Sequence, residues 1–321
     1  MTTRTSSRNA ASFTPFTRPF DVERAIDGAA TFVRTYLTQS RQSRLVIGVS
    51  GGIDSAVVAC LAARAVGANK LLLVAMPYGL HNASQHAPST EASLRDAILV
   101  HQALPGSTFI VDDISTMVDA HAAASSALAI ALQRQDPETY RNPWPTITDA
   151  ADAPVLGNLK ARTRAVRLRM WANMYRGLVL GTENATEHWC GYFTIGGDEE
   201  SDIEVLPPFT KCEVRAMARA LGVPEPILTK APSADLWVGQ TDEEELGFTY
   251  DEADAVVASL EVIGAGKLSV DAVLTNPELT ADAQRASLLS TDRFDAVVER
   301  IRATHFKRGH RPTFDGGDCR R

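Results

Sequence analysis

The chain has 321 residues, a length that fits two average domains or one large α/β domain. Hydrophobic residues make up 45% and charged residues 22% of it, which excludes the disordered, collagenous and membrane classes. The net charge of −7 argues against a surface built throughout for nucleic acid, so a nucleic-acid partner is not expected. Because neither a long uncharged apolar run nor an apolar leader is found, we predict a cytoplasmic protein without a membrane segment.

The cysteines are far apart in the chain and include no C-x-x-C pair, so neither a disulfide framework nor a cysteine zinc site is predicted. No base partner for a nucleophilic thiol is visible near them. We therefore interpret them as small core or surface residues: Cys60, Cys190, Cys212 and Cys319.

Residues 1–18 contain three arginines, many serines and threonines, and no acidic residue. This composition predicts a disordered tail, with an organelle transit peptide as the alternative. Residues 19–321 are predicted to form a single domain with a helical C-terminal part. It begins with an amphipathic helix over residues 20–38, whose apolar face consists of Ile26, Ala30, Val33 and Leu37.

Four short apolar runs read as buried strands, and helical patterns separate them. Alternation of strands and helices predicts a mostly parallel sheet with helices on both faces, which is the doubly wound α/β class. The predicted strands are residues 45–49, 71–75, 109–111 and 178–180.

Two polar, proline-containing stretches, residues 77–90 and 135–157, are longer than ordinary connections between such elements. Loops of this length are usually functional or mobile. We expect both to become ordered when a ligand binds.

The sharpest motif is Ser50-Gly51-Gly52-Ile53-Asp54-Ser55, which follows the first strand and opens a helix. Glycines let the backbone approach an anion, and a helix N-terminus presents free N–H groups, so the motif predicts a phosphate cradle. The chain contains no P-loop sequence, because its Gly-Lys pair, at 266–267, is followed by Leu268 and not by Ser or Thr. The motif at 50–55 also contains no G-x-G-x-x-G fingerprint of a dinucleotide-binding loop. A carboxylate at Asp54 is placed to hold Mg²⁺ against a leaving phosphate group, or simply to cap the helix.

The fourth strand ends at Gly181-Thr182, and Glu187 follows five residues after Thr182. In α/β sheets, ligands bind at the carboxyl ends of the strands. Glu187 is therefore a candidate for a second metal carboxylate, with a solvated glutamate on a helix as the alternative.

Residues 158–176 carry six basic residues and no acidic one. The run fits a site for ATP phosphates, a site for RNA, or a solvated basic face. The basic residues are Lys160, Arg162, Arg164, Arg167, Arg169 and Arg176. The positions predicted to pack are Leu159, Thr163, Val166, Met170 and Met174.

Residues 198–204 form an acidic run that fits a solvated loop, a Ca²⁺-like site or a ligand clamp. The run lacks the ligand spacing of an EF-hand. His81 and His86 are interpreted as surface loop histidines rather than as a metal pair.

The S-G-G-x-D-S motif resembles the pyrophosphate loop of the N-type ATP pyrophosphatases, which cleave ATP between the α- and β-phosphates. With further blocks in the same order, the chain from about residue 44 to 312 resembles the NAD synthetase family, most weakly over residues 77–157. The matching blocks are residues 48–55, 158–162, 181–182 with Glu187, 191–194, 232–236 and 240–247. The resemblance implies a Rossmann-like sheet of the N-type ATP pyrophosphatase kind.

The resemblance implies ATP as co-substrate and Mg²⁺ as cofactor, with Asp54 and Glu187 as the metal ligands and Asp54, Lys211 and Ser233 in catalytic positions. Deamido-NAD is implied to contact Arg162, Asp198 and Asp202, together with a C-terminal pair that matches His305 and Lys307 with one residue inserted. The residues implied to contact ATP are Gly48, Val49, Ser50, Gly51, Gly52, Ile53, Asp54, Ser55, Thr182, Lys211 and Ser233.

The activity implied by the resemblance is the ATP-dependent amidation of deamido-NAD to NAD, through a NAD-adenylate and with release of AMP and pyrophosphate. Only 49 residues precede Ser50, which leaves no room for the amidase domain of glutamine-dependent members, so ammonia is the expected nitrogen source. A homodimer is also implied. The alternatives are another N-type ATP pyrophosphatase that adenylates a different acid or a tRNA base, and a non-catalytic nucleotide binder.

The sequence departs from the family pattern at two places beside the expected dinucleotide site. Ile195 stands where the family usually has lysine, and Glu199-Glu200 stand where it often has two glycines. One cation fewer and two anions more weaken the binding of a phosphate-bearing substrate unless another basic residue compensates.

Overall fold

The computed structural model describes residues 18–80, 88–136, 138, 153–233, 236, 240–264 and 269–308. The predicted tail lies outside these residues except for Arg18, and so do His81, His86 and Cys319. Arg18 itself is anchored, because its guanidinium donates to Glu213 Oε1 at 2.7 Å and also to Glu261.

Five parallel strands form one sheet in the order β3-β2-β1-β4-β5. The strands are β1 (Arg44–Gly48), β2 (Leu71–Ala75), β3 (Thr108–Val111), β4 (Gly177–Gly181) and β5 (Ile203–Glu204). The doubly wound, Rossmann-like α/β class and the four predicted strands are confirmed. Sequence reasoning missed β5, because its two residues lie inside the acidic run.

The central strand β1 pairs with β2 and β4, so Leu45 lies beside Leu71 on one side and Leu178 on the other. Successive side chains of a strand point to opposite faces of the sheet. Leu45 accordingly packs in the core under one helical layer and Val46 in the core under the other, and both are fully buried.

The first face is covered by α1 (Val22–Ser40), α2 (Ile53–Val66), α3 (Pro88–Ala103), α7 (Lys211–Ala220) and α8 (Glu225–Leu228), and the short η1 (Ala68–Lys70) follows α2. Helix α1 begins after Asp21, whose side chain accepts a hydrogen bond from the Arg24 amide at 3.1 Å. The predicted apolar face of this helix is confirmed, because its four members are buried against the sheet and α2: Ile26, Ala30, Val33 and Leu37.

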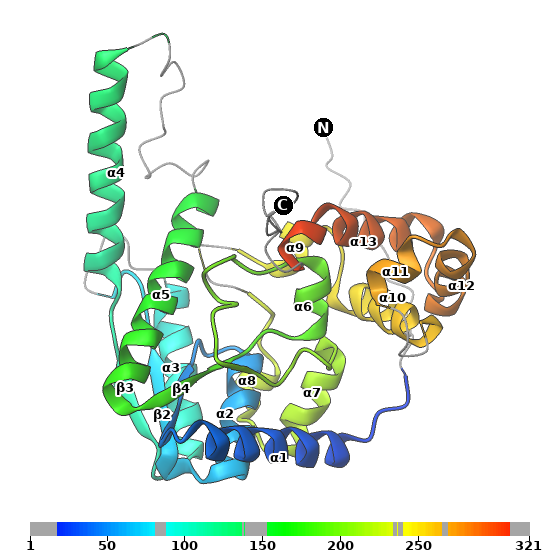
Figure 1. The fold of residues 1–321 in the computed structure, drawn as a ribbon, viewed down its shortest axis with the longest axis horizontal. Coiled ribbons are helices and arrows are strands. Elements are labelled where there is room, and N and C mark those ends of the chain that lie inside the picture. The colour runs from blue at the N-terminus through cyan, green and yellow to red at the C-terminus, as the bar shows by residue number, and fades with distance from the viewer. Residues whose placement is uncertain are drawn as a thin grey trace, which may run out of the picture.

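The second face is covered by α4 (Ser115–Gln135) and α5 (Ala153–Tyr175). Figure 1 shows that the C-terminal part of α4 projects beyond the rest of the described molecule. The predicted loops at residues 77–90 and 135–157 extend too far at their C-terminal ends, because α3 begins at Pro88 and α5 begins at Ala153. The described helices include none that is long and apolar enough to cross a membrane.

Helix α5 packs on β1 and β4, with Ala172 buried in the core of this face and Leu168, Trp171 and Tyr175 packed against it. The helix lies so close to β1 that a Cβ on Gly48 would be 3.3 Å from the Leu168 side chain. The prediction that Val166 and Met174 pack inward was wrong, since 68% and 64% of them are exposed. The buried positions are Gly157, Lys160, Ala161, Thr163, Ala165 and Ala172.

A third core joins the C-terminal helices to α6 and gives the chain its predicted helical C-terminal part. Figure 1 shows these helices gathered at the side of the molecule away from β3. They are α6 (Ala185–Cys190), α9 (Asp242–Leu246), α10 (Tyr250–Ile263), α11 (Val270–Leu274), α12 (Pro277–Ser287), α13 (Thr291–Ala303) and α14 (His305–Arg308). Cys60, Cys190 and Cys212 are free thiols, and burial raises the pKa of Cys60 to about 11.

Candidate active site

Three charged side chains meet at the carboxyl edge of the sheet, and each one follows a different strand. Asp54 is in the first turn of α2 after β1, Glu187 is in α6 after β4, and Lys211 begins α7 after β5. These three strands are neighbours and run parallel, so their carboxyl ends lie side by side. The chain also reverses its order between β1 and β4, which is the switch point where ligands of open α/β sheets bind.

Lys211 joins the two carboxylates, with its Nζ 2.6 Å from Asp54 Oδ2 and 2.8 Å from Glu187 Oε1. We call these three residues the charged cluster. The Lys211 side chain is only 3% exposed. Burial opposes its charge, but the two carboxylates outweigh burial and raise the pKa of Lys211, so the ammonium form persists at neutral pH.

The phosphate-loop candidate, residues 48–55, turns sharply between β1 and α2. Gly51 has a φ of +77°, and a Cβ there would lie 2.3 Å from the Ser93 carbonyl oxygen. Only glycine fits this conformation and this approach to α3. The Ser55 hydroxyl donates to the Gly52 carbonyl at 3.0 Å and accepts from the Ser50 amide at 3.3 Å, which closes the loop on the helix.

Asn184 connects the charged cluster to α6. Its Oδ1 accepts the Glu187 amide at 3.0 Å as the N-cap of the helix, while its Nδ2 donates to Asp54 Oδ1 at 2.9 Å. One side chain thus holds the Asp54 carboxylate and the start of the helix that carries Glu187. Sequence reasoning missed Asn184, although its position three residues before Glu187 is a capping-box spacing.

Asp254 of α10 lies behind the charged cluster and is 1% exposed. Its carboxylate accepts the backbone amides of Lys211 at 3.1 Å and Cys212 at 2.6 Å, and the hydroxyl of Thr186 donates to it as well. A carboxylate at a helix N-terminus is stabilised by the free amides and the helix dipole. Asp254 therefore holds the start of α7 against the start of α6.

Tyr250 packs on the other side of Lys211, whose Nζ lies 4.7 Å from the centre of the ring. The tyrosine hydroxyl is 3.3 Å from Glu187 Oε1 and 3.0 Å from Asp242 Oδ2. Burial in first place and the neighbouring carboxylates in second raise the pKa of Tyr250, so the phenol stays protonated. The block at residues 240–247 that resembles the family ends three residues before Tyr250, and the sequence gives no other signal for this residue.

Two further residues predicted to contact ATP lie on connections around this edge. Thr182 follows β4 directly and comes two residues before Asn184. Ser233 is exposed, and its hydroxyl donates to the Gln240 carbonyl at 2.8 Å. Residues 234–235 and 237–239, which complete the predicted block after Ser233, lie outside the described part of the chain.

A lysine not singled out by the sequence borders the phosphate-loop candidate. Lys230 donates to Asp96 Oδ2 at 2.9 Å and to the Ser93 hydroxyl at 3.1 Å. Ser93 and Asp96 are also the residues against which Gly51 packs. Lys230 thus ties the segment that leads to Ser233 to the wall of the loop.

The residues predicted to contact the dinucleotide are distributed over several separate contacts. Arg162 Nε donates to the Ile195 carbonyl at 3.1 Å, and the Thr194 amide donates to Asp198 Oδ1 at 2.9 Å. Asp202 accepts the Val179 amide at 2.8 Å and pairs with Arg169. The structure therefore brings Arg162 and Asp198 to the loop around Ile195, whereas Asp202 lies at the edge of β4.

The C-terminal pair diverges within one turn of α14. Lys307 Nζ donates to the carbonyls of Gly191 at 2.8 Å and Phe193 at 2.6 Å, close to the loop that holds Asp198. His305 instead faces Asp271, with 3.7 Å between its Nε2 and Oδ2 of that aspartate. The structure brings Lys307 to this loop and does not bring His305 to it.

The charged cluster also meets the requirements of the predicted magnesium site. Asp54 and Glu187 present carboxylate oxygens, the ligand type that Mg²⁺ prefers, and Mg²⁺ usually takes one or two carboxylates together with substrate phosphates. Within the described ranges no group of three or more His, Cys, Asp or Glu side chains is arranged for a metal. The donor set fits an ion shared with a phosphate ligand rather than a cage made by protein alone.

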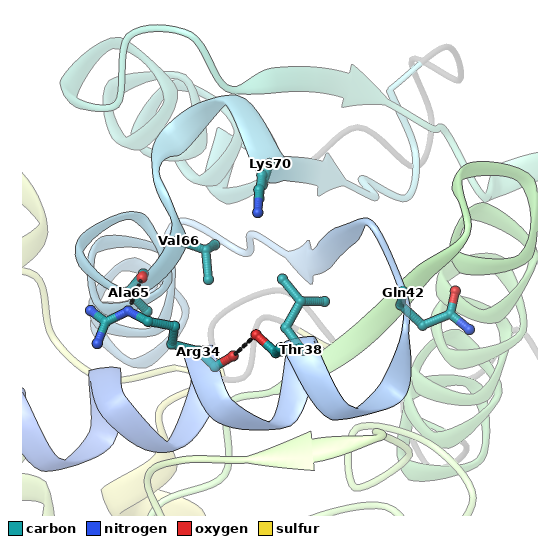
Figure 2. Close-up of a pocket in the computed structure, with 7 residues that line it drawn as sticks. Arg34, Thr38, Gln42, Ala65, Val66 and Lys70 are labelled. Atoms are coloured by element: carbon teal, nitrogen blue, oxygen red, sulfur yellow. Dashed lines mark hydrogen bonds between the residues drawn. The ribbon is translucent and has the colours of Figure 1, made fainter.

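A cavity of about 280 Å³ lies elsewhere, where α1 and α2 end. Figure 2 shows Arg34, Thr38 and Lys70 around it, and Arg34 Nε donates to the Ala65 carbonyl at 2.8 Å. Helix α2 begins at the phosphate-loop candidate and ends at Val66, so this cavity is at the opposite end of the helix from Asp54. It plays no part in the site.

Fold and site together define a class of protein: a doubly wound α/β enzyme with an anion-binding loop after β1 and a lysine and two carboxylates at the topological switch point. A sequence model of the NAD synthase family matches residues 25–310, and the chain belongs to this family. The predicted enzyme class, a ligase of the NAD synthetase type, is confirmed by this membership. The alternatives of another pyrophosphatase or a non-catalytic binder are not favoured.

Named relatives and a solved structure agree. An NH₃-dependent NAD⁺ synthetase from Methanococcoides burtonii is 40% identical over 257 residues, which cover 80% of this chain and 86% of that protein. One from Trichlorobacter lovleyi is 35% identical over 277 residues, covering 86% and 85%. The structure of an NMN synthetase from Francisella tularensis superposes with a TM-score of 0.70 at 26% identity, covering 92% of this chain and all of that one.

Proposed function

We propose that this protein catalyses the ATP-dependent amidation of deamido-NAD to NAD with ammonia, through a NAD-adenylate and with release of AMP and pyrophosphate. The observation that carries the proposal is Lys211 held between Asp54 and Glu187 beside the glycine loop at the switch point of the sheet. A cation and two metal-type carboxylates next to an anion cradle are what cleavage of ATP between its α- and β-phosphates requires.

In this proposal residues 48–55 receive the pyrophosphate part of ATP, and Thr182 and Ser233 contact the nucleotide from the neighbouring connections. The glycines allow close approach of the backbone, and the first amides of α2 face the phosphates. Lys211 keeps its positive charge and stabilises negative charge that develops on phosphate oxygens as the nicotinate carboxylate attacks the α-phosphate.

Asp54 and Glu187 are proposed to hold Mg²⁺ when ATP is bound. The ion would neutralise the phosphates and stabilise the departing pyrophosphate. The two carboxylates share a single lysine, so one negative charge is left over to attract a divalent cation, and the ATP phosphates supply the rest. Asn184 holds the Asp54 carboxylate through its Nδ2 and the start of α6, which carries Glu187, through its Oδ1.

Deamido-NAD is proposed to lie along the loop of residues 191–198, near Arg162, Asp198 and Lys307, with Asp202 and His305 as further proposed contacts. Arg169 supplies compensation for the acidic departures of this sequence. Its guanidinium pairs with Asp202 and lies 3.6 Å from Glu200 Oε2. Glu199 is partly satisfied by the Gly196 amide, which donates to its Oε1 at 3.0 Å.

The homodimer and the cytoplasmic location are proposed with the function. Exposed apolar side chains on α4 and α5, which contact each other, support an interface there: Leu128, Ile130, Val155, Val166 and Met174. Light scattering of the Val166→Glu variant tests the interface. We expect a wild-type mass of two chains and a variant mass of one, and a monomeric wild-type protein would contradict the dimer.

The function is tested by mass spectrometry of products formed by the purified chain from deamido-NAD and Mg²⁺-ATP. Ammonium and glutamine are supplied in separate reactions, and nicotinate mononucleotide replaces deamido-NAD in a third, because the Francisella tularensis structure is that of an NMN synthetase. We expect equal amounts of NAD and AMP with ammonium and none with glutamine.

A matched pair of variants controls this experiment. Asp54→Asn removes a proposed metal ligand, while Asp27→Asn alters an exposed aspartate of α1 that pairs with Arg64. The first variant is expected to lose turnover and the second to keep it. If only nicotinate mononucleotide gives an amide product, the substrate is the mononucleotide and not deamido-NAD. If neither compound gives a product, the proposed function is contradicted.

A further inference from the structure

Tyr250 stands between the charged cluster and α9, and its hydroxyl faces a carboxylate on each side. Glu187 Oε1 is 3.3 Å away and Asp242 Oδ2 is 3.0 Å away, while the side chain itself is 1% exposed. A phenol has one O–H group, so it donates to only one of these carboxylates at a time. In this buried position water does not replace the bond that is given up.

The contacts continue from Asp242 toward Ser233. The Tyr192 hydroxyl lies 3.0 Å from both Asp242 Oδ1 and Glu245 Oε2. Gln240 Nε2 donates to Glu245 at 2.9 Å, and the carbonyl of Gln240 accepts the hydroxyl of Ser233 at 2.8 Å. Contacts at hydrogen-bond distance therefore connect Glu187 through Tyr250 and α9 to Ser233.

The charges around Tyr250 make its hydroxyl sensitive to a cation at the cluster. Asp54, Glu187 and Asp242 carry three negative charges when ionised, and Lys211 supplies one positive charge. A cation that binds the Glu187 carboxylate weakens that carboxylate as an acceptor, because its lone pairs are then engaged. The phenol proton then favours Asp242, and the bond to α9 strengthens.

We propose that Tyr250 is a positioning residue. When a ligand binds at the charged cluster, Tyr250 holds α9 more firmly in position, and α9 in turn holds Ser233 in position. The identity of the ligand, Mg²⁺ with ATP, rests on the proposed function, but the coupling itself does not. Binding at the cluster commits the tyrosine hydroxyl to Asp242. The hydrogen bond from Tyr250 to Asp242 then holds α9 in position as long as the nucleotide is bound.

The test uses Tyr250→Phe, which keeps the ring under Lys211 and removes only the hydroxyl. Tyr175→Phe is the matched control, because that ring lies at the end of α5 against Trp171, remote from α9 in the chain and in the fold. The probe is Mg²⁺ with α,β-methylene-ATP, which is not cleaved between the α- and β-phosphates. Calorimetry measures its binding, and a glutamate-specific protease measures access to the exposed Glu244 and Glu245 of α9.

For the wild type and Tyr175→Phe, we expect the probe to slow cleavage at α9 at least tenfold. Tyr250→Phe is expected to bind the probe with about tenfold lower affinity, the effect of one lost hydrogen bond to a charged group, and to show no protection. In turnover assays its KM for ATP rises about tenfold, while its kcat changes less than twofold. These results would support the coupling, since a purely structural role would not separate KM from kcat or binding from protection.

Equal protection in Tyr250→Phe and wild type would overturn the proposal, and so would a wild type whose α9 the probe leaves unprotected. Should Tyr250→Phe fail to fold, Tyr192→Phe cuts the next link, and it is expected to lose protection while it retains probe binding. A wild type that binds the probe but makes no NAD contradicts the proposed function alone. The protection experiment still decides the coupling in that case.

Discussion

The two ends of the proposed site differ in how closely the fold controls them. At the ATP end, Asp54, Glu187 and Lys211 contact one another although 157 positions separate the first from the last. At the dinucleotide end, the predicted residues take separate partners: Asp202 pairs with Arg169, and His305 faces Asp271. Residues implied by the same resemblance thus come together at one end and take separate partners at the other.

The difference follows from what carries each residue. The ATP-end residues stand at or just before the first turn of helices that begin after neighbouring parallel strands, so strand register sets their separation. Apart from Arg162 of α5, the dinucleotide-end residues lie on turns and on the four-residue α14, where local hydrogen bonds decide each side chain. A ligand therefore has more to organise at the dinucleotide end than at the ATP end.

The largest effect is expected at the centre of the ATP end, for Lys211→Met. Loss of the buried lysine leaves two partly buried carboxylates facing each other, which costs up to about 3–5 kcal/mol of unfolding free energy, and kcat/KM falls roughly a thousandfold. Added Mg²⁺ should restore more stability to the variant than to the wild type, because it replaces the missing charge. Thermal melts with and without Mg²⁺ check this, with Lys70→Met at the opposite end of α2 as the control.

A melt of Lys211→Met that does not respond to Mg²⁺ would contradict the assignment of Asp54 and Glu187 as a metal pair. Lys70→Met is expected to leave both the melt and the turnover unchanged, since Lys70 lies in η1 beside the remote cavity.

The next effect is expected for Gly51→Ala in the phosphate-loop candidate. The new Cβ meets the Ser93 carbonyl at 2.3 Å at a φ of +77°, so the loop must shift, and the KM for ATP is expected to rise about a hundredfold. Gly222→Ala is the matched control, because Gly222 has a φ of +71° but a Cβ added there would meet no atom within 4 Å. It should lose about 1–2 kcal/mol of stability from strain alone and keep its KM.

Steady-state kinetics and denaturant melts of the two glycine variants separate steric contact from backbone strain. A Gly51→Ala variant with the ATP KM of Gly222→Ala would show that the close approach to α3 does not shape the nucleotide site.

A smaller and selective effect is expected for Arg169→Ala at the dinucleotide end. Its loss leaves Glu200 and Asp202 without their cation, so the KM for deamido-NAD should rise about tenfold while the KM for ATP stays within twofold. Arg215→Ala, which alters an exposed pair with Asp251, is the control. Equal changes in both KM values would remove the distinction between the two ends.

The last effect concerns stability alone and belongs to Glu204 of β5. Burial raises its pKa to about 7, and its buried Oε2 has no hydrogen-bond partner among the described residues. A carboxyl that binds its proton more tightly when folded makes stability fall as pH rises from the unfolded pKa of about 4.5 to the folded value. Glu204→Gln should therefore gain at most about 3 kcal/mol at pH 8 and almost nothing at pH 4, as melts at both pH values would reveal.

An equal gain at both pH values would mean that packing, and not ionisation, explains the Glu204 effect. Glu225→Gln, on the exposed side of α8, is the control and should change the melt at neither pH.

Much of the fold followed from the sequence because its signals are local and strong. Three such signals each define an element or a buried face on their own. They are the apolar run at 45–49, the glycines at 51 and 52, and the spacing of Ile26, Ala30, Val33 and Leu37. Strand β5 did not follow, because two residues within an acidic run carry no period. The packing of α5 did not follow either, since Val166 and Met174 are exposed while Leu168 and Ala172 pack in the core under this helix.

At the site, the residues with conspicuous chemistry were found and the ones that hold them were not. Asp54, Glu187 and Lys211 carry charge next to recognisable blocks. Asn184 and Asp254 act by accepting backbone amides or by donating to a partner distant in sequence, and such contacts exist only after folding. The same holds for Tyr250, whose partners come from α6, α7 and the start of α9.

Adenylation of a substrate carboxylate by ATP is the chemistry proposed for the charged cluster. The most direct measurement of it is exchange of labelled pyrophosphate into ATP, with Mg²⁺ present and ammonia absent, for the wild type and Asp54→Asn. We expect exchange in the wild type only when deamido-NAD is added, and a loss of at least a thousandfold in the variant. Exchange without deamido-NAD, or undiminished exchange in Asp54→Asn, would contradict this role of the cluster.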